Sequence, residues 1–163
     1  MNPSLPTPPL AADLVERRKR LRADGKTLVF TNGCFDLVHP GHVSYLKEAA
    51  AMGDELWIGI NGDGSVRALK GDKRPILSES ERAYLLRAFS FVAEVFVFPE
   101  MRLTEEIRII RPDIYVKAGD YTLESLDKSE RAAFEEVGSS IVFVPFLEGF
   151  STSAMIGRIK EAF

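Results

Sequence analysis

Cysteine and histidine are scarce in this sequence, with one cysteine and two histidines among 163 residues. A single cysteine cannot form an internal disulfide bond, which excludes a disulfide-stapled fold and suits a reducing compartment. No apolar run approaches about 18 residues, so no stretch predicts a membrane-spanning helix. The first nine residues also lack the basic start and apolar core of a signal peptide. We therefore expect a cytoplasmic protein that does not interact with membranes.

Positive charge is not in excess either. The chain has 21 Lys and Arg against 24 Asp and Glu, a net charge of −3. This balance argues against a nucleic-acid partner, and any phosphate must be bound by a few locally placed groups. The basic run 17–20 is then best interpreted as the solvated face of a helix. The hydrophobic share of 45% and charged share of 28% are typical of one globular domain of ordinary size.

Short apolar runs alternate with helical periods along the chain. Four of the nine prolines fall in residues 1–9, which we expect to be a flexible lead-in. The domain is predicted over 10–163, starting with an amphipathic helix at 10–24. Strands are predicted to begin near Thr27, Glu55, Glu94, Asp113 and Ser140, and helices to cover 39–52, 78–89, 104–110, 125–137 and 151–162. This alternation predicts an α/β fold with a five-stranded parallel sheet and helices on both faces.

In such sheets ligands bind beyond the carboxyl ends of the strands, so the segment after the first strand is the most informative. It runs Thr31-Asn32-Gly33-Cys34-Phe35-Asp36-Leu37-Val38-His39-Pro40-Gly41-His42. Pro40 suits the first position of a helix, whose free N–H groups attract anions. His39 and His42 are three residues apart and fall on one side of that first turn. Together these features predict a compact cradle for a polyphosphate.

Three other interpretations of this segment stay open. The two histidines and Cys34 could form a zinc site. Cys34 could act as a nucleophile with a histidine as its base, although a small, half-buried packing residue is the simpler interpretation. Both histidines could also be purely structural.

The segments Asn32 to Asp36 and His39-Pro40-Gly41-His42 resemble the signature of the HxGH-motif, cytidylyltransferase-like nucleotidyltransferase superfamily, which has a Rossmann-like fold. The resemblance covers residues 27 to 162. It includes Asn61-Gly62-Asp63, Leu69-Lys70-Gly71, Arg74-Pro75-Ile76, Glu81-Arg82, Val116-Lys117-Ala118-Gly119-Asp120-Tyr121 and Gly149-Phe150-Ser151-Thr152-Ser153. It is strongest for the adenylyltransferase domain of ADP-heptose synthase, the RfaE domain II family, followed by glycerol-3-phosphate cytidylyltransferase. Ala118 stands where the heptose group usually has Gly, and Ser153 where it has Thr.

The resemblance implies an in-line displacement at the α-phosphorus of a nucleoside triphosphate, which depends on positioning and charge stabilisation. The catalytic residues that it implies are His39, His42, Lys70 and Arg82. The implied nucleotide-binding residues are Asn32, Gly33, Cys34, Phe35, Gly41, His42, Asp63, Lys117, Gly119, Asp120, Ser151, Thr152 and Ser153. The implied acceptor-binding residues are Asp36, Lys70 and Arg74. Asp63 could instead cap a helix, and Arg82 is predicted on the polar side of its helix.

The implied reaction joins ATP and heptose 1-phosphate to give ADP-heptose and pyrophosphate. We expect Mg²⁺ to arrive with the nucleotide, held by phosphate oxygens and water without protein ligands. The resemblance is to a stand-alone transferase, so we expect it to work with a separate sugar kinase. We also expect a homodimer. The alternatives are a cytidylyltransferase that uses CTP and glycerol 3-phosphate or a related ester, and a nucleotide-binding module without catalytic activity.

Overall fold

The computed structural model describes residues 11–119, 121–145 and 147–163. The predicted lead-in at 1–9 and the candidate site residue Asp120 lie outside these residues. No helix within the described ranges is long and apolar enough to cross a membrane.

The centre of the fold is a five-stranded parallel sheet in the order β3-β2-β1-β4-β5. Its strands are β1 (Leu28–Gly33), β2 (Glu55–Asn61), β3 (Glu94–Phe98), β4 (Ile114–Ala118) and β5 (Ser140–Val144). The predicted sheet is thus confirmed, with each strand starting within one residue of its expected position. The strand order reverses between β1 and β4, and ligands bind at such a reversal in doubly wound sheets.

The helices of the described chain are α1 (Ala11–Ala23), α2 (Pro40–Ala50), α3 (Asp63–Lys70), α4 (Glu79–Arg87), α5 (Thr104–Ile110), α6 (Lys128–Val137) and α7 (Thr152–Ala162). The sequence analysis missed α3 because this helix is short and contains Gly64, a poor helix former. The helix predicted from 125 begins later, at Lys128, because the Asp127 side chain accepts from the N–H groups of its first turn.

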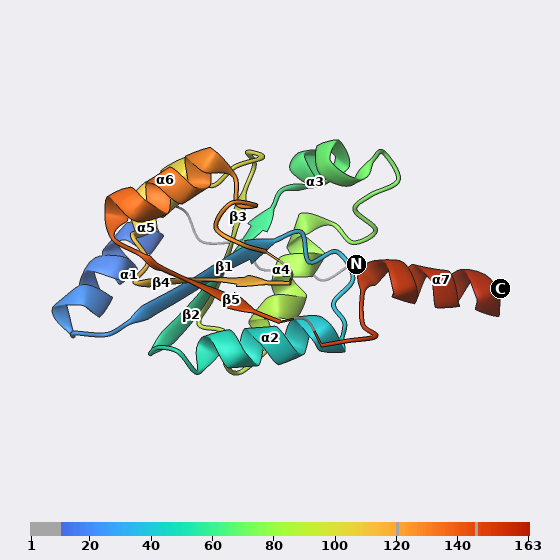
Figure 1. The fold of residues 1–163 in the computed structure, drawn as a ribbon, viewed down its shortest axis with the longest axis horizontal. Coiled ribbons are helices and arrows are strands. Elements are labelled where there is room, and N and C mark those ends of the chain that lie inside the picture. The colour runs from blue at the N-terminus through green and yellow to red at the C-terminus, as the bar shows by residue number, and fades with distance from the viewer. Residues whose placement is uncertain (1–10, 120, 146) are drawn as a thin grey trace, which may run out of the picture.

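Two hydrophobic layers form because alternate strand residues face opposite sides of the sheet. Leu28 and Phe30 of β1 pack with α1, α5 and α6, whereas Val29, between them, packs with α2 and α4. Figure 1 shows these two helical layers on opposite faces of the sheet. Helix α7 extends away from both layers and has no buried residue among those described. The loops at the carboxyl ends of the strands are therefore held by a core that is filled on both sides.

Candidate functional site

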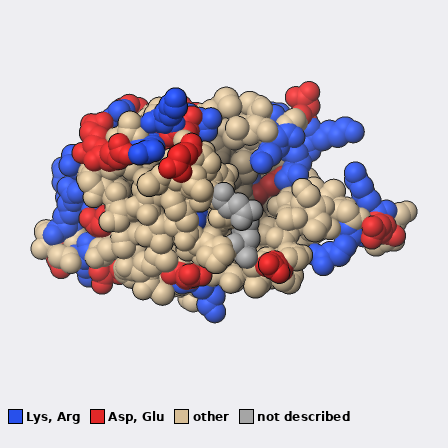
Figure 2. Space-filling view, viewed as in Figure 1, with Lys and Arg blue, Asp and Glu red and all other residues tan. Residues whose placement is uncertain are grey.

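A cavity of about 400 Å³ lies at the carboxyl ends of β1, β2 and β4. Its lining comprises Asn32, Gly33, Cys34, Phe35, Asp36, His42, Asn61, Leu69, Lys70, Arg74, Met101, Arg102, Lys117, Tyr121, Glu130, Thr152 and Ser153. Most of its charged side chains are basic. Figure 2 shows Lys and Arg side chains gathered around α3 and the segment after it. The position and the charge of this cavity fit a ligand that carries phosphate groups.

The two histidines cap the first turn of α2, as predicted. His39 is the N-cap residue and its ring stacks on that of His42, with ring centroids 3.8 Å apart. The backbone N–H of His42 donates to Nδ1 of His39 at 3.3 Å, and the backbone N–H of His39 donates to Nδ1 of His42 at 3.4 Å. Since each Nδ1 accepts a hydrogen bond, the proton of each neutral ring sits on Nε2.

Burial keeps both imidazoles neutral near pH 7. It lowers the pKa of His42 to about 4, with a further contribution from the neighbouring His39, and it lowers the pKa of His39 as well. His42 lines the cavity, whereas His39 is 6% exposed and is not part of the lining. His42 therefore supplies a neutral N–H donor at the wall of the cavity, next to the positive end of the α2 dipole, where an anion is stabilised.

Close packing around the two histidines explains why Gly41 and Phe35 occupy their positions in the motif. A Cβ on Gly41 would lie 3.0 Å from the His39 ring, so a larger residue would push the ring out of its present place. Phe35 has a φ of +47°, which is uncommon for a residue with a large side chain. Its ring lies 5.2 Å from that of His42. Gly41 thus acts through packing and does not line the cavity.

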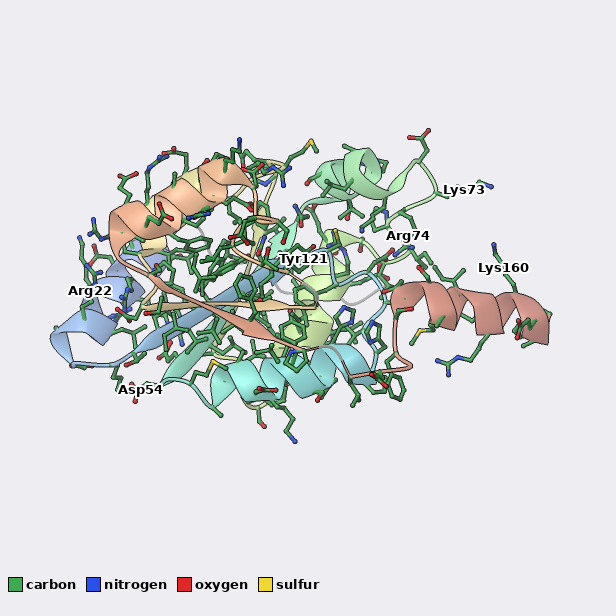
Figure 3. All side chains as sticks on the ribbon, viewed as in Figure 1. Arg22, Asp54, Lys73, Arg74, Tyr121 and Lys160 are labelled. Atoms are coloured by element: carbon green, nitrogen blue, oxygen red, sulfur yellow. The ribbon has the colours of Figure 1, made fainter. Side chains whose placement is uncertain are left out.

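The neighbouring Asp36 holds the loop that follows α3. Its carboxylate accepts from the backbone N–H groups of Ile76 and Leu77 at 2.7 and 3.0 Å and pairs with the Arg74 guanidinium. Although burial opposes ionisation, these hydrogen bonds lower the pKa of Asp36 below its usual range. In Figure 3 Arg74 turns toward the body of the protein while Lys73 points away from it. Asp36 lines the cavity but uses its oxygens on the protein, which supports a positioning role.

Arg82 is buried, and the prediction that it lies on the polar side of its helix is wrong. Its guanidinium donates to the carbonyl oxygens of Leu77, Cys34 and Asn61 and to Oδ1 of Asp63, at 3.1, 2.5, 2.8 and 2.8 Å. These acceptors lie in the segments that follow β1 and β2 and precede α4. Arg82 does not line the cavity. This placement supports a role in holding the three segments together.

Lys117 is a half-buried cation and does reach the cavity. Burial lowers its pKa. Its Nζ donates to Oδ1 of Asn32 at 3.3 Å and lies 5.2 Å from the centre of the Tyr121 ring. Tyr115 Oη donates to the same Asn32 oxygen at 2.6 Å. The ends of β1 and β4 are thus linked by side chains directly beside the cavity.

The structure brings most of the predicted site residues together. Those that line the cavity are Asn32, Gly33, Cys34, Phe35, Asp36, His42, Lys70, Arg74, Lys117, Thr152 and Ser153. Those that do not are His39, Gly41, Asp63, Arg82, Gly119 and Ser151, of which Ser151 caps α7.

Some lining residues were not predicted. Met101 and Arg102 could have been found, because they follow the carboxyl end of β3. Tyr121 ends the segment 116–121 that resembles the family, but the resemblance assigns it no role. Glu130 gave no signal, because it looks like any polar residue of a helix.

Neither alternative use of Cys34 gains support. No group of three or more His, Cys, Asp or Glu side chains in the described chain could hold a metal ion. Burial raises the pKa of the Cys34 thiol, which disfavours the reactive thiolate. Cys34 is half-buried, which agrees with the packing interpretation.

Comparison with known proteins gives one family and a consistent set of relatives. The model of the cytidylyltransferase-like family matches residues 30–158. A protein named bifunctional protein HldE from Syntrophotalea carbinolica is 46% identical over 149 residues, which cover 91% of this chain and 29% of that protein. HldE of Helicobacter pylori strain P12 is 49% identical over 138 residues, covering 85% of this chain and 29% of that protein. The chain therefore spans about three tenths of the length of these relatives.

A solved structure shares the fold. The crystal structure of the lipopolysaccharide core biosynthesis protein from Thermoplasma volcanium matches with a TM-score of 0.61 and 27% sequence identity. The match covers 76% of this chain and 98% of that one.

Proposed function

This chain belongs to the cytidylyltransferase-like family, and on that basis we propose that it transfers AMP from ATP to heptose 1-phosphate, giving ADP-heptose and pyrophosphate. The observation that carries this proposal is the stacked pair of neutral histidines at the N-terminus of α2, beside a cavity lined by lysine and arginine. The choice of ATP and heptose 1-phosphate rests on the resemblance to ADP-heptose synthase and on the similarity to HldE proteins.

The proposed chemistry needs no general base on the protein. The acceptor phosphate attacks the α-phosphorus in line and pyrophosphate leaves, so the protein has to place two anions and stabilise the charge between them. The Nε2–H groups of the histidine pair and the positive end of the α2 dipole stabilise that charge. Lys70, at the end of α3, closes on the phosphates from the other side, while Thr152 and Ser153 bind the triphosphate from the first turn of α7.

Magnesium enters this proposal with the nucleotide. The carboxylate of Asp36 is occupied by hydrogen bonds within the protein, and the described residues supply no cluster of metal ligands. The ion is then held by phosphate oxygens and water, where it neutralises part of the triphosphate charge.

A second candidate is a cytidylyltransferase that uses CTP and glycerol 3-phosphate. The family description favours it, because the matching model is named for cytidylyl transfer. Ala118 is buried close to the cavity, and its methyl group narrows the space for a base compared with the glycine of the heptose group. A nucleotide-binding module without catalysis is the candidate of another class.

A pyrophosphate-release assay over a matrix of triphosphates and acceptors separates these candidates. We expect the highest kcat/KM with ATP and D-glycero-D-manno-heptose 1-phosphate in the presence of Mg²⁺. Faster release with CTP and glycerol 3-phosphate would select the second candidate. Nucleotide binding without pyrophosphate release for any acceptor would select the binding module.

We further propose a cytoplasmic homodimer. Its acceptor comes from a sugar kinase, as the resemblance to ADP-heptose synthase implies and as the name of the bifunctional HldE relatives supports. Light scattering of the purified chain tests the dimer. An assay that couples a sugar kinase to this chain tests the supply of the acceptor. If the kinase product yields no ADP-sugar, the proposed source of the acceptor is wrong.

A further inference from the structure

Glu130 is a buried carboxylate on the wall of the cavity that the proposed chemistry does not use. It lies in the first turn of α6, is 7% exposed and lines the cavity. Its Oε1 accepts from the backbone N–H of Leu103 at 3.2 Å, which links α6 to the loop before α5. Among the described residues no hydrogen bond reaches its second oxygen, Oε2, which is not among the fully buried atoms without a partner.

A buried carboxylate with free acceptor capacity calls for a donor from a ligand. An ionised carboxylate has about four acceptor positions, and those that open on the cavity are filled by water or by donors of a ligand. The N-terminus of α6 stabilises the negative charge in part, since the helix dipole is positive there. The ligand at this point must therefore present O–H or N–H groups, because a phosphate would be repelled by the carboxylate.

The other charged groups in the lining are used differently. Asp36, the other carboxylate among the described lining residues, is occupied by Arg74 and two backbone amides. Arg102 also lines the cavity, and its Nε lies 3.1 Å from Oδ2 of Asp127, the N-cap residue of α6. Lys117, which Glu130 affects electrostatically, is engaged with Asn32. This wall thus offers one acceptor and one anchored donor, and a hydroxyl group can both donate to the first and accept from the second.

The base of the nucleotide has a better place elsewhere. A smaller cavity of about 150 Å³ shares Lys117 and Tyr121 with the larger one and adds Tyr45 and Ala118. Its aromatic and aliphatic surfaces suit a flat base, and Glu130 is not part of it. The Glu130 wall belongs to the larger cavity, which also contains Lys70 and Arg74, the residues predicted to bind the acceptor phosphate.

From these contacts we propose that Glu130 determines acceptor specificity by accepting hydrogen bonds from hydroxyl groups of the acceptor sugar, with Arg102 donating to the same hydroxyls. This inference rests on the proposed function. It assigns the wall formed by α6 and the loop before α5 to the polyol part of the acceptor. Acceptors with few hydroxyl groups would leave this carboxylate unsatisfied and be disfavoured.

The test compares Glu130→Ala and Glu130→Gln with the matched control Glu135→Gln, an exposed carboxylate on the same helix. We expect Glu130→Ala to raise the KM for the sugar 1-phosphate about 10- to 100-fold, the loss typical of a hydrogen bond to a charged group. Glu130→Gln keeps an acceptor oxygen without the charge, so its KM should lie between those of the wild type and Glu130→Ala. The KM for the triphosphate should stay within about twofold in both variants, and Glu135→Gln should match the wild type.

A merely structural role would change a different set of readouts. Loss of the Leu103 contact alone would lower the melting temperature and raise both KM values together, which would overturn the proposal. A rise in the KM for the triphosphate alone would also overturn it, because Glu130 would then bind the nucleotide. If the wild type shows no pyrophosphate release with any acceptor, the proposed function fails first. If it does release pyrophosphate and the acceptor KM of Glu130→Ala is unchanged, only this inference fails.

Discussion

Replacing Arg82 separates a structural role from direct contact with substrate. The four hydrogen bonds of its guanidinium join three chain segments beside the cavity, and the residue is 0% exposed. Arg82→Ala would leave three carbonyl oxygens and the Asp63 carboxylate without this donor. A buried acceptor left unsatisfied costs about 1–3 kcal/mol, and breaking a buried ion pair costs about 3–5 kcal/mol.

These costs do not simply add, because water can enter the space that the side chain leaves. We therefore expect Arg82→Ala to lower the free energy of unfolding by about 3–5 kcal/mol. This is a large part of the roughly 5–15 kcal/mol that stabilises a typical domain. Arg82→Lys keeps the charge near Asp63 but lacks the planar fork, so we expect a loss smaller than that of Arg82→Ala.

The assay is urea unfolding of the ligand-free protein, followed by circular dichroism. Arg67→Ala in α3 is the control, because an exposed arginine should change stability by no more than about 0.5 kcal/mol. Our interpretation is refuted if Arg82→Ala unfolds at the wild-type urea concentration while activity is lost. That result would assign Arg82 to direct contact with substrate.

Three further predictions address the cavity. His42→Ala should lower kcat about 10²–10³-fold with little change in KM, because donors to transition-state charge act in this way; steady-state kinetics with near-wild-type kcat would contradict it. Folding lowers the pKa of His42 from 6.5 to about 4, so the unfolded state binds the proton first as pH falls. The contribution of neutral His42 to the free energy of unfolding is therefore complete above pH 6.5 and is lost toward pH 4. Urea midpoints across this window should fall less for His42→Gln than for the wild type, and equal falls would refute the assignment. Asp36→Asn should raise the acceptor KM about tenfold. It should also speed tryptic cleavage after Lys73, since the loop after α3 loses the ion pair between Asp36 and Arg74. An unchanged cleavage rate would show that Asp36 does not hold this loop.

The sequence by itself determined the features that depend on neighbours along the chain. The alternation of short apolar runs with helical periods was enough for the parallel sheet, because burial on both faces demands continuous apolar strands. The placement of the two histidines was equally predictable. Its spacing, its proline and its glycine all act within one helical turn, where His39 and His42 cap each other's backbone. The helix α3 was missed, since eight residues with a glycine carry little periodic signal.

Only the tertiary structure decided which polar side chains are buried and what they bond. Arg82 hydrogen-bonds to Cys34, 48 residues away, and Glu130 to Leu103, 27 residues away. In the sequence each looks like an ordinary charged residue of a helix surface. Apart from the Asp63 carboxylate, which pairs with Arg82, their partners are backbone groups. Every residue carries such groups, so no residue type in the sequence marks them. The packing of α4 and α6 on opposite faces of the sheet selects which backbone groups they meet, and this is a property of the assembled fold.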